Sequence, residues 1–165
     1  MNESKTQLKA QHKFLDYLYW NLFAALPFIT ACIGIYKNSI IWLIFYVIIF
    51  LCLIILIYRF YCTHCPHYIQ GAKTTKCMFF WGIPKFFKSN TKPPNFFEKA
   101  VSLIAALIIL LLPLYWLRFH TELFVIYLLS LAVFGITIRR NECRRCIYFN
   151  CPANNVPEDI KGAKL

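Results

Sequence analysis

The chain of 165 residues is long enough for one domain, yet 59% of it is hydrophobic and only 15% is charged. Water-soluble domains carry about 25% charged residues, so this composition excludes an ordinary soluble globule. The formal net charge of +11 is explained by membrane topology and by attraction to anionic lipid headgroups. No nucleic-acid recognition element accompanies it, and we expect no nucleic-acid partner.

Four apolar segments follow one another along the chain, each close to the length of about 20 residues that crosses a bilayer as a helix. The first, residues 14–36, contains Asp16 in its first turn, where a helix N-terminus favours negative charge. A cleaved signal peptide fits this segment poorly, because the apolar stretch is long and lacks a small-residue cleavage motif. The other three are residues 39–58, 100–117 and 122–138. The sequence therefore predicts an all-α integral membrane protein with four transmembrane helices.

The connections between these segments alternate in length and in charge. Short turns follow the first and third segments, whereas residues 1–13, 59–99 and 139–165 carry most of the lysines and arginines. The positive-inside rule then places both termini in the cytoplasm and makes this a multi-pass protein of the cell membrane. We expect one membrane domain over residues 1–165, with a cytoplasmic N-terminal tail, a central loop and a C-terminal tail.

Each pair of apolar segments is followed by a cationic, cysteine-rich exit, RFYCTHCPHY from Arg59 and RNECRRCIYF from Arg140. The first exit and its loop contain Cys62, Cys65 and Cys77 (the first triplet), and the second contains Cys143, Cys146 and Cys151 (the second triplet). Because each helical hairpin crosses the membrane twice, both halves have the same orientation, and we expect a parallel repeat about the membrane normal. The two C-x-x-C pairs are then expected at one membrane face, near enough to meet.

The spacing of these cysteines points to a metal site. Cytoplasmic thiols stay reduced, so metal binding or thiol chemistry explains the triplets better than a disulfide framework. Two C-x-x-C pairs complete a tetrahedral site of four thiolates. The expected ligands are Cys62, Cys65, Cys143 and Cys146, with Cys77 and Cys151 as substitutes or as members of a second site.

Zinc and an iron–sulfur cluster are both compatible with this ligand set. Zinc would clamp the two hairpins together without doing chemistry. A cluster is favoured by the all-cysteine supply and by the prolines that follow Cys65 and Cys151, as in bacterial ferredoxin motifs. His64 and His67 flank the first pair and are candidates for a nitrogen ligand.

Three further regions carry expectations of their own. Cys32 and Cys52 fall inside apolar segments, where a small apolar core residue is the ordinary role. Residues 78–97 interleave aromatic side chains with lysines, and we expect short helical pieces lying on the membrane surface. Residues 152–165 are expected to form a polar, mobile tail.

The function that these features favour is electron transfer between a soluble cytoplasmic protein partner and the membrane, through the metal site. The first alternative is a membrane scaffold or subunit with a purely structural zinc. A thiol-based membrane enzyme follows, in which neighbouring arginines lower the pKa of the cysteines. A cysteine-lined metal transporter is the last. The sequence leaves the metal, the substrate, the partner and the oligomeric state undecided.

Overall fold

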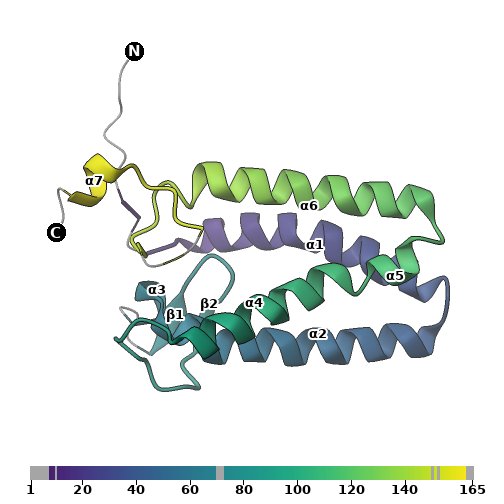
Figure 1. Ribbon diagram of the computed structural model, residues 1–165, viewed down its shortest axis with the longest axis horizontal. Helices are drawn as coiled ribbons and strands as arrows, with labels where there is room; N and C mark the ends of the chain where they lie inside the picture. Colours follow the sequence, from purple (N-terminus) through teal and green to yellow (C-terminus); the bar gives the residue numbers. More distant parts are fainter. Residues whose placement is uncertain (1–7, 10, 70–72, 150, 152, 163–165) are drawn as a thin grey trace, which may run out of the picture.

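The computed structural model describes residues 8–9, 11–69, 73–149, 151 and 153–162. Within these residues four long helices lie side by side, and loops with shorter elements cover one end of the bundle (Figure 1). All four helices are long and apolar enough to cross a membrane. Their outer faces expose large apolar side chains such as Leu15, Leu22 and Ile41, as expected of a surface that contacts lipid. The predicted helical architecture with four helices of membrane-spanning length and hydropathy is confirmed.

The first two helices form an antiparallel pair joined by a tight turn. α1 comprises Phe14–Tyr36 and α2 comprises Ile40–Phe60. Ser39 caps α2, because its side-chain oxygen accepts a hydrogen bond of 3.2 Å from the Ile41 N–H. The chain continues from α2 into a 3₁₀ turn, η1 (Cys62–His64), and then into the short helix α3 (Pro66–Ile69). The first C-x-x-C pair thus follows directly on the end of a long helix.

The third long helix begins four residues earlier than residue 100, where the sequence predicted it. α4 comprises Phe96–Leu111 and starts with a capping box, in which the Asn95 N–H donates a 2.7 Å hydrogen bond to Glu98. Pro113 has no N–H to continue the helix, and the chain turns into the short helix α5 (Leu114–Leu117). The last long helix, α6, comprises Thr121–Asn141.

Two helix pairs make up the bundle: α1 packs chiefly against α6, and α2 chiefly against α4. Side chains from both pairs and from α5 meet in one buried cluster, which contains Ala31, Ile35, Tyr46, Leu117 and Tyr127. The Tyr127 hydroxyl donates a 2.9 Å hydrogen bond to the Leu110 carbonyl, so this buried polar group is satisfied.

The expectation of helical pieces in residues 78–97 is wrong. The loop contains an antiparallel hairpin of β1 (Thr74–Lys76) and β2 (Trp81–Pro84), and regular helix resumes only at Phe96. Gly82 has a φ of 78°, which an α-helix cannot accommodate. The buried Thr75 hydroxyl donates a 2.8 Å hydrogen bond to the Ile83 carbonyl and so fastens the two strands together.

The C-terminal segment contains a short helix and packing contacts that the sequence did not predict. Helix α7 comprises Glu158–Gly162, and Val156 before it is buried. The Asn154 side chain donates 3.1 Å hydrogen bonds to the Cys146 and Tyr148 carbonyls, which holds the segment against the second triplet. Residues 152 and 163–165 of the expected tail lie outside the described residues.

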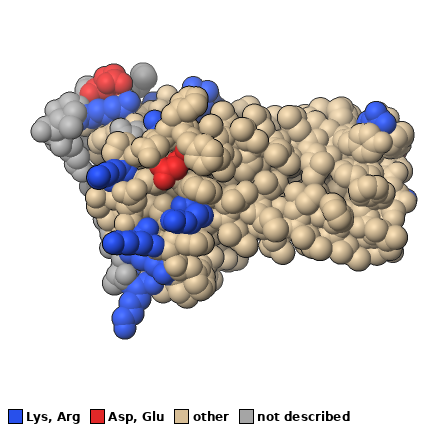
Figure 2. Space-filling model, turned by 60° about the horizontal axis from the view of Figure 1, so that its bottom comes forward, with Lys and Arg blue, Asp and Glu red and all other residues tan. Residues whose placement is uncertain are grey.

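Charge is distributed along the long axis of the molecule. Figure 2 shows lysines and arginines gathered at one end, an uncharged surface along the helices, and isolated cations at the opposite end. The charged end is the one where α2 and α6 finish and where the β-hairpin, α3 and α7 lie (Figure 1). We call it the cysteine end, because both triplets belong to it.

Candidate metal centre

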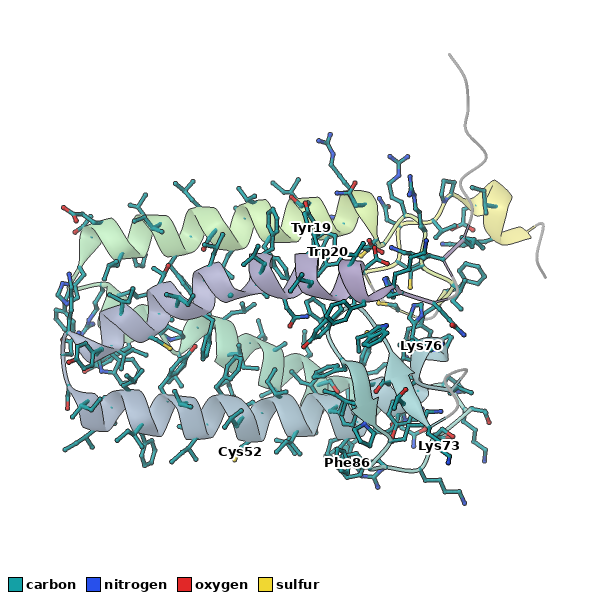
Figure 3. All side chains as sticks on the ribbon, turned by 180° about the vertical axis from the view of Figure 1, so that it is seen from behind. Tyr19, Trp20, Cys52, Lys73, Lys76 and Phe86 are labelled. Carbon is teal, nitrogen blue, oxygen red and sulfur yellow. The ribbon has the colours of Figure 1, made fainter. Side chains whose placement is uncertain are left out.

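All eight cysteines lie in described residues, and all are free thiols. Cys62 lies in η1 and Cys65 directly after it, while Cys77 follows β1. Cys143 and Cys146 follow the end of α6. Cys52 does not have the core position expected of it: it is exposed on α2 and points away from the bundle (Figure 3). Cys32 is half-buried within α1 and packs against the central core cluster.

The fold brings the two triplets next to each other. Cys65 interacts electrostatically with Cys77 of its own triplet and with Cys146 and Cys151 of the other. Cys146 in turn interacts electrostatically with Cys77, and Cys62 interacts in the same way with Cys65 and Cys77. Thiols that are more than 60 positions apart in the sequence are therefore neighbours in the structure.

These thiols lie in surroundings that disfavour a free thiolate. Burial raises the pKa of the Cys65 thiol to about 12, and the neighbouring cysteines raise it as well. Burial also raises the pKa of Cys146 to about 11, although the Tyr148 N–H, which donates a 3.4 Å hydrogen bond to its sulfur, acts in the opposite direction. At Cys143 burial outweighs the lowering effect of Arg139, so the pKa is again raised. Arg139 thus acts on the pKa of Cys143 in the expected direction, but burial outweighs it and the net lowering expected of the arginines is not found there.

Chemically the six thiols suit a thiophilic metal. Cysteine sulfur is the preferred ligand of structural zinc and of iron–sulfur clusters, and metal coordination deprotonates a thiol that is otherwise hard to ionise. Across the described residues, however, no three His, Cys, Asp or Glu side chains already form a group that could hold a metal ion. The donors are gathered, but their side chains would have to draw closer to coordinate one centre.

The two histidines of the first exit have different surroundings. His64 Nδ1–H donates a 2.7 Å hydrogen bond to the Lys92 carbonyl, and its Nε2 lies 3.3 Å from Glu98. His64 therefore fastens the loop before α4 to η1, and both its ring nitrogens have protein partners. His67 instead faces the second triplet, with its Nε2 3.9 Å from the Cys146 sulfur.

Sequence reasoning missed a polar cluster beside the second triplet, which we call the Glu142 network: Lys9, His12, Asp16, Trp20 and Glu142. Lys9 Nζ lies 3.2 Å from Glu142 and 3.0 Å from Asp16. The Lys9 N–H also donates a 2.7 Å hydrogen bond to the Arg145 carbonyl. The sequence feature that could have revealed this network is Glu142, which is one of only seven acidic residues in the chain and directly precedes Cys143.

His12 connects this network to the first exit, through His67. Its ring lies 4.8 Å from that of His67, and its Nδ1 is 3.6 Å from Glu142. Burial lowers the pKa of His12 to about 4; His67 and Lys9 also lower it, and the two carboxylates partly oppose them. His12 is therefore neutral at neutral pH. The N-terminal segment thus contributes a buried imidazole next to the gathered thiols.

No protein-family profile, curated protein or solved structure matches this chain. The distinctive feature is the meeting of two cysteine triplets at the charged end of a four-helix membrane bundle.

Proposed function

We propose that this protein is a membrane metalloprotein whose two cysteine triplets bind one thiophilic centre at the cytoplasmic face, and that the centre supports electron transfer between a soluble partner and the membrane. The observation that carries the proposal is the position of Cys65, which interacts with thiols of both triplets: Cys62 and Cys77 of its own and Cys146 and Cys151 of the other. Metal coordination gives a reason for gathering buried thiols that would otherwise remain protonated.

The proposed parallel repeat is supported by how the helices pack. A twofold axis along the membrane normal would exchange α1 with α4 and α2 with α6. It would therefore exchange the α1–α6 contact with the α2–α4 contact, and these are the two main contacts of the bundle. The two triplets would then stand at equivalent helix ends.

The cytoplasmic location rests on the charge distribution. Lysines and arginines concentrate at the cysteine end, and that end faces the cytoplasm by the positive-inside rule. The same cations would attract anionic lipid headgroups and an acidic face of a soluble redox protein.

A purely structural zinc is the second candidate, and one specific observation favours it. The triplets follow α2 and α6, which belong to different helix pairs. A metal held by both triplets would tie these pairs together at their ends, whether or not it changed oxidation state.

The deciding experiment measures metal content, acid-labile sulfide and the visible spectrum of the full-length protein, purified anaerobically in detergent. Iron with acid-labile sulfide and broad absorption at about 400 nm supports the electron-transfer proposal. Stoichiometric zinc without colour supports the structural candidate. The variant Cys65→Ser/Cys146→Ser should lose the metal, and Cys32→Ser/Cys52→Ser is the matched control that should retain it. Absence of any metal from the anaerobically purified protein contradicts both candidates.

A further inference from the structure

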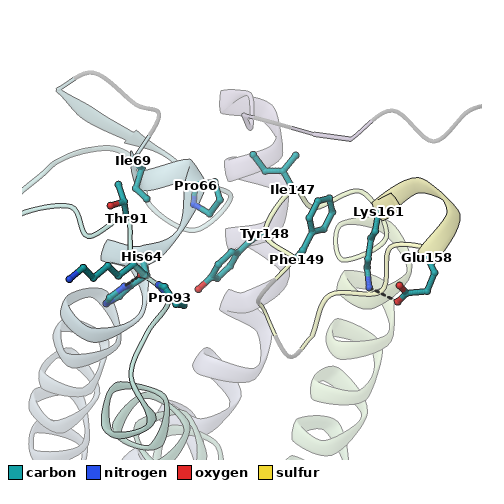
Figure 4. Close-up of a pocket in the computed structure, with 11 residues that line it drawn as sticks. His64, Pro66, Ile69, Thr91, Pro93, Ile147, Tyr148, Phe149, Glu158 and Lys161 are labelled. Carbon is teal, nitrogen blue, oxygen red and sulfur yellow. Dashed lines mark hydrogen bonds and ion pairs between the residues drawn. The ribbon is translucent and has the colours of Figure 1, made fainter. Parts of the chain in front are cut away.

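A cavity of about 580 Å³ opens at the cysteine end, between the segment after α2, the loop before α4 and the C-terminal segment (Figure 4). This volume lies within the range of about 300–1,000 Å³ that is usual for small-molecule sites. Most of its wall is apolar or aromatic, and the residues that form this part are Pro66, Ile69, Pro93, Ile147, Tyr148 and Phe149. Such a wall suits a ring-shaped, largely apolar ligand.

One polar group in the wall is left without a partner. Tyr148 is only 7% exposed, and its buried hydroxyl has no hydrogen-bond partner among the residues that the structure describes. In Figure 4 the Tyr148 ring extends across the cavity wall, with its hydroxyl toward His64 and Pro93. A buried hydroxyl without a partner is costly, so a ligand oxygen that accepts its hydrogen bond would be favoured.

Two of the three charged side chains in the lining neutralise each other. Lys161 is already paired with Glu158 at 3.0 Å, and the carboxylate would repel a phosphate. Lys92 is exposed at the cavity, and in the described part of the chain its ammonium has no ion-pair partner. Beside the Lys161–Glu158 pair, the lining thus offers the Lys92 ammonium and the hydroxyls of Thr91 and Tyr148, which suits a neutral ring with electron-rich oxygens.

The cavity lies next to the segments that carry the thiols, although no cysteine lines it. Pro66 and Ile147, on its wall, each follow a triplet cysteine in the sequence, Cys65 and Cys146 respectively. Tyr148 also interacts electrostatically with Cys65, Cys146 and Cys151. A molecule in the cavity would therefore lie near the proposed metal centre, with Tyr148 close to both.

We propose that this cavity binds a quinone, whose carbonyl oxygen accepts a hydrogen bond from the Tyr148 hydroxyl. Quinones combine an apolar ring with two carbonyl oxygens and reach the headgroup region from the membrane. The electron-transfer role of the bound quinone rests on the proposed function, whereas its binding can be measured independently of any metal.

The test is calorimetric titration of the full-length protein, in lipid nanodiscs, with the short-tailed benzoquinone decylubiquinone. We expect saturable binding that Tyr148→Phe weakens by about 5- to 10-fold, as the loss of one hydrogen bond implies. Ile147→Trp should abolish binding by filling the cavity. Tyr115→Phe, on α5 at the opposite end of the bundle, is the matched control and should bind like the unaltered protein.

Circular dichroism checks that each variant folds, and Tyr148→Phe decides the matter if Ile147→Trp does not. Absence of saturable binding, or binding that neither variant changes, overturns the proposal. Metal content measured on the same samples separates this inference from the proposed function. A loaded metal centre without quinone binding overturns the quinone site alone. Quinone binding that depends on Tyr148 in a protein that holds no metal supports the quinone site and contradicts the metal centre.

Discussion

The indole N–H of Trp20, in α1, donates a 3.1 Å hydrogen bond to the carboxylate of Glu142, at the end of α6. Lys9 contacts the same carboxylate, so one side chain joins the N-terminal segment, the first helix and the last. Glu142 directly precedes Cys143 in the sequence. The position of the second triplet therefore depends on interactions made far from it in the chain.

Replacing Glu142 should lower the free energy of unfolding, by an amount that depends on how many of its contacts with Trp20 and Lys9 are lost. Glu142→Ala leaves the buried Trp20 indole without an acceptor and Lys9 with Asp16 as its remaining partner, and we expect a loss of about 1–3 kcal/mol in the free energy of unfolding. Glu142→Gln keeps an oxygen for Trp20 and should cost less than half of that. Denaturation of the detergent-solubilised protein, followed by circular dichroism, measures both. Equal losses would show that the charge facing Lys9 carries the whole effect.

The lowered pKa of His12 predicts instability in mild acid. Folding lowers the pKa of His12 from its ordinary value of 6.5 to about 4. Between these two pH values the imidazole is therefore protonated in the unfolded chain and neutral in the folded protein. Keeping His12 neutral costs the fold no stability above about pH 6.5, and this cost grows progressively as the pH falls toward about 4. Thermal denaturation midpoints across this range should fall for the unaltered protein and fall less for His12→Gln. A parallel decline in both would contradict the prediction.

Hydropathy was enough to predict the four long helices, because each apolar run lacks the charges that the bilayer core excludes. It was not enough for the segment of residues 78–97. Aromatic side chains interleaved with lysines suit an interfacial helix and a short hairpin equally, and the positive φ of Gly82 cannot be read from the pattern.

The chemistry of the cysteine end was predictable in part. The C-x-x-C pairs and the membrane topology together indicated that the triplets would meet. The approach of His12 to His67 was not predictable, because it depends on how the N-terminal segment docks across the end of α6. The cavity beside Tyr148 likewise arises from three segments that are distant in the sequence.

A single centre shared by both triplets makes a sharp prediction about metal stoichiometry. Replacing all three cysteines of either triplet by serine should remove essentially all bound metal, because neither triplet alone supplies four ligands. Metal analysis of the two triple variants, beside the unaltered protein, measures this. If each variant instead retains about half of the metal, the triplets form two independent sites and the shared centre is wrong.

Orientation in the membrane can be tested with reporter fusions. Green fluorescent protein, which fluoresces in the cytoplasm, should be bright when fused after the C-terminal segment, because the cysteine end is expected to face inward. Alkaline phosphatase, which is active outside the cytoplasm, should be active when fused after Asn38, in the turn between α1 and α2. The reverse pattern in a bacterial inner membrane would place the triplets outside and undermine the cytoplasmic partner.

Two glycines offer a matched test of helix packing. A Cβ atom on Gly34, in α1, would lie 2.5 Å from Cδ2 of Leu117, which is fully buried and has little room to move. We therefore expect Gly34→Ala to cost about 1–3 kcal/mol of unfolding free energy. Gly135, in α6, has nothing within 4 Å of the corresponding Cβ position among the described residues. Gly135→Ala should be neutral or stabilise by up to about 1 kcal/mol, because alanine favours the helix. Chemical denaturation of both variants measures the contrast, and equal effects would contradict the close approach of α1 to α5.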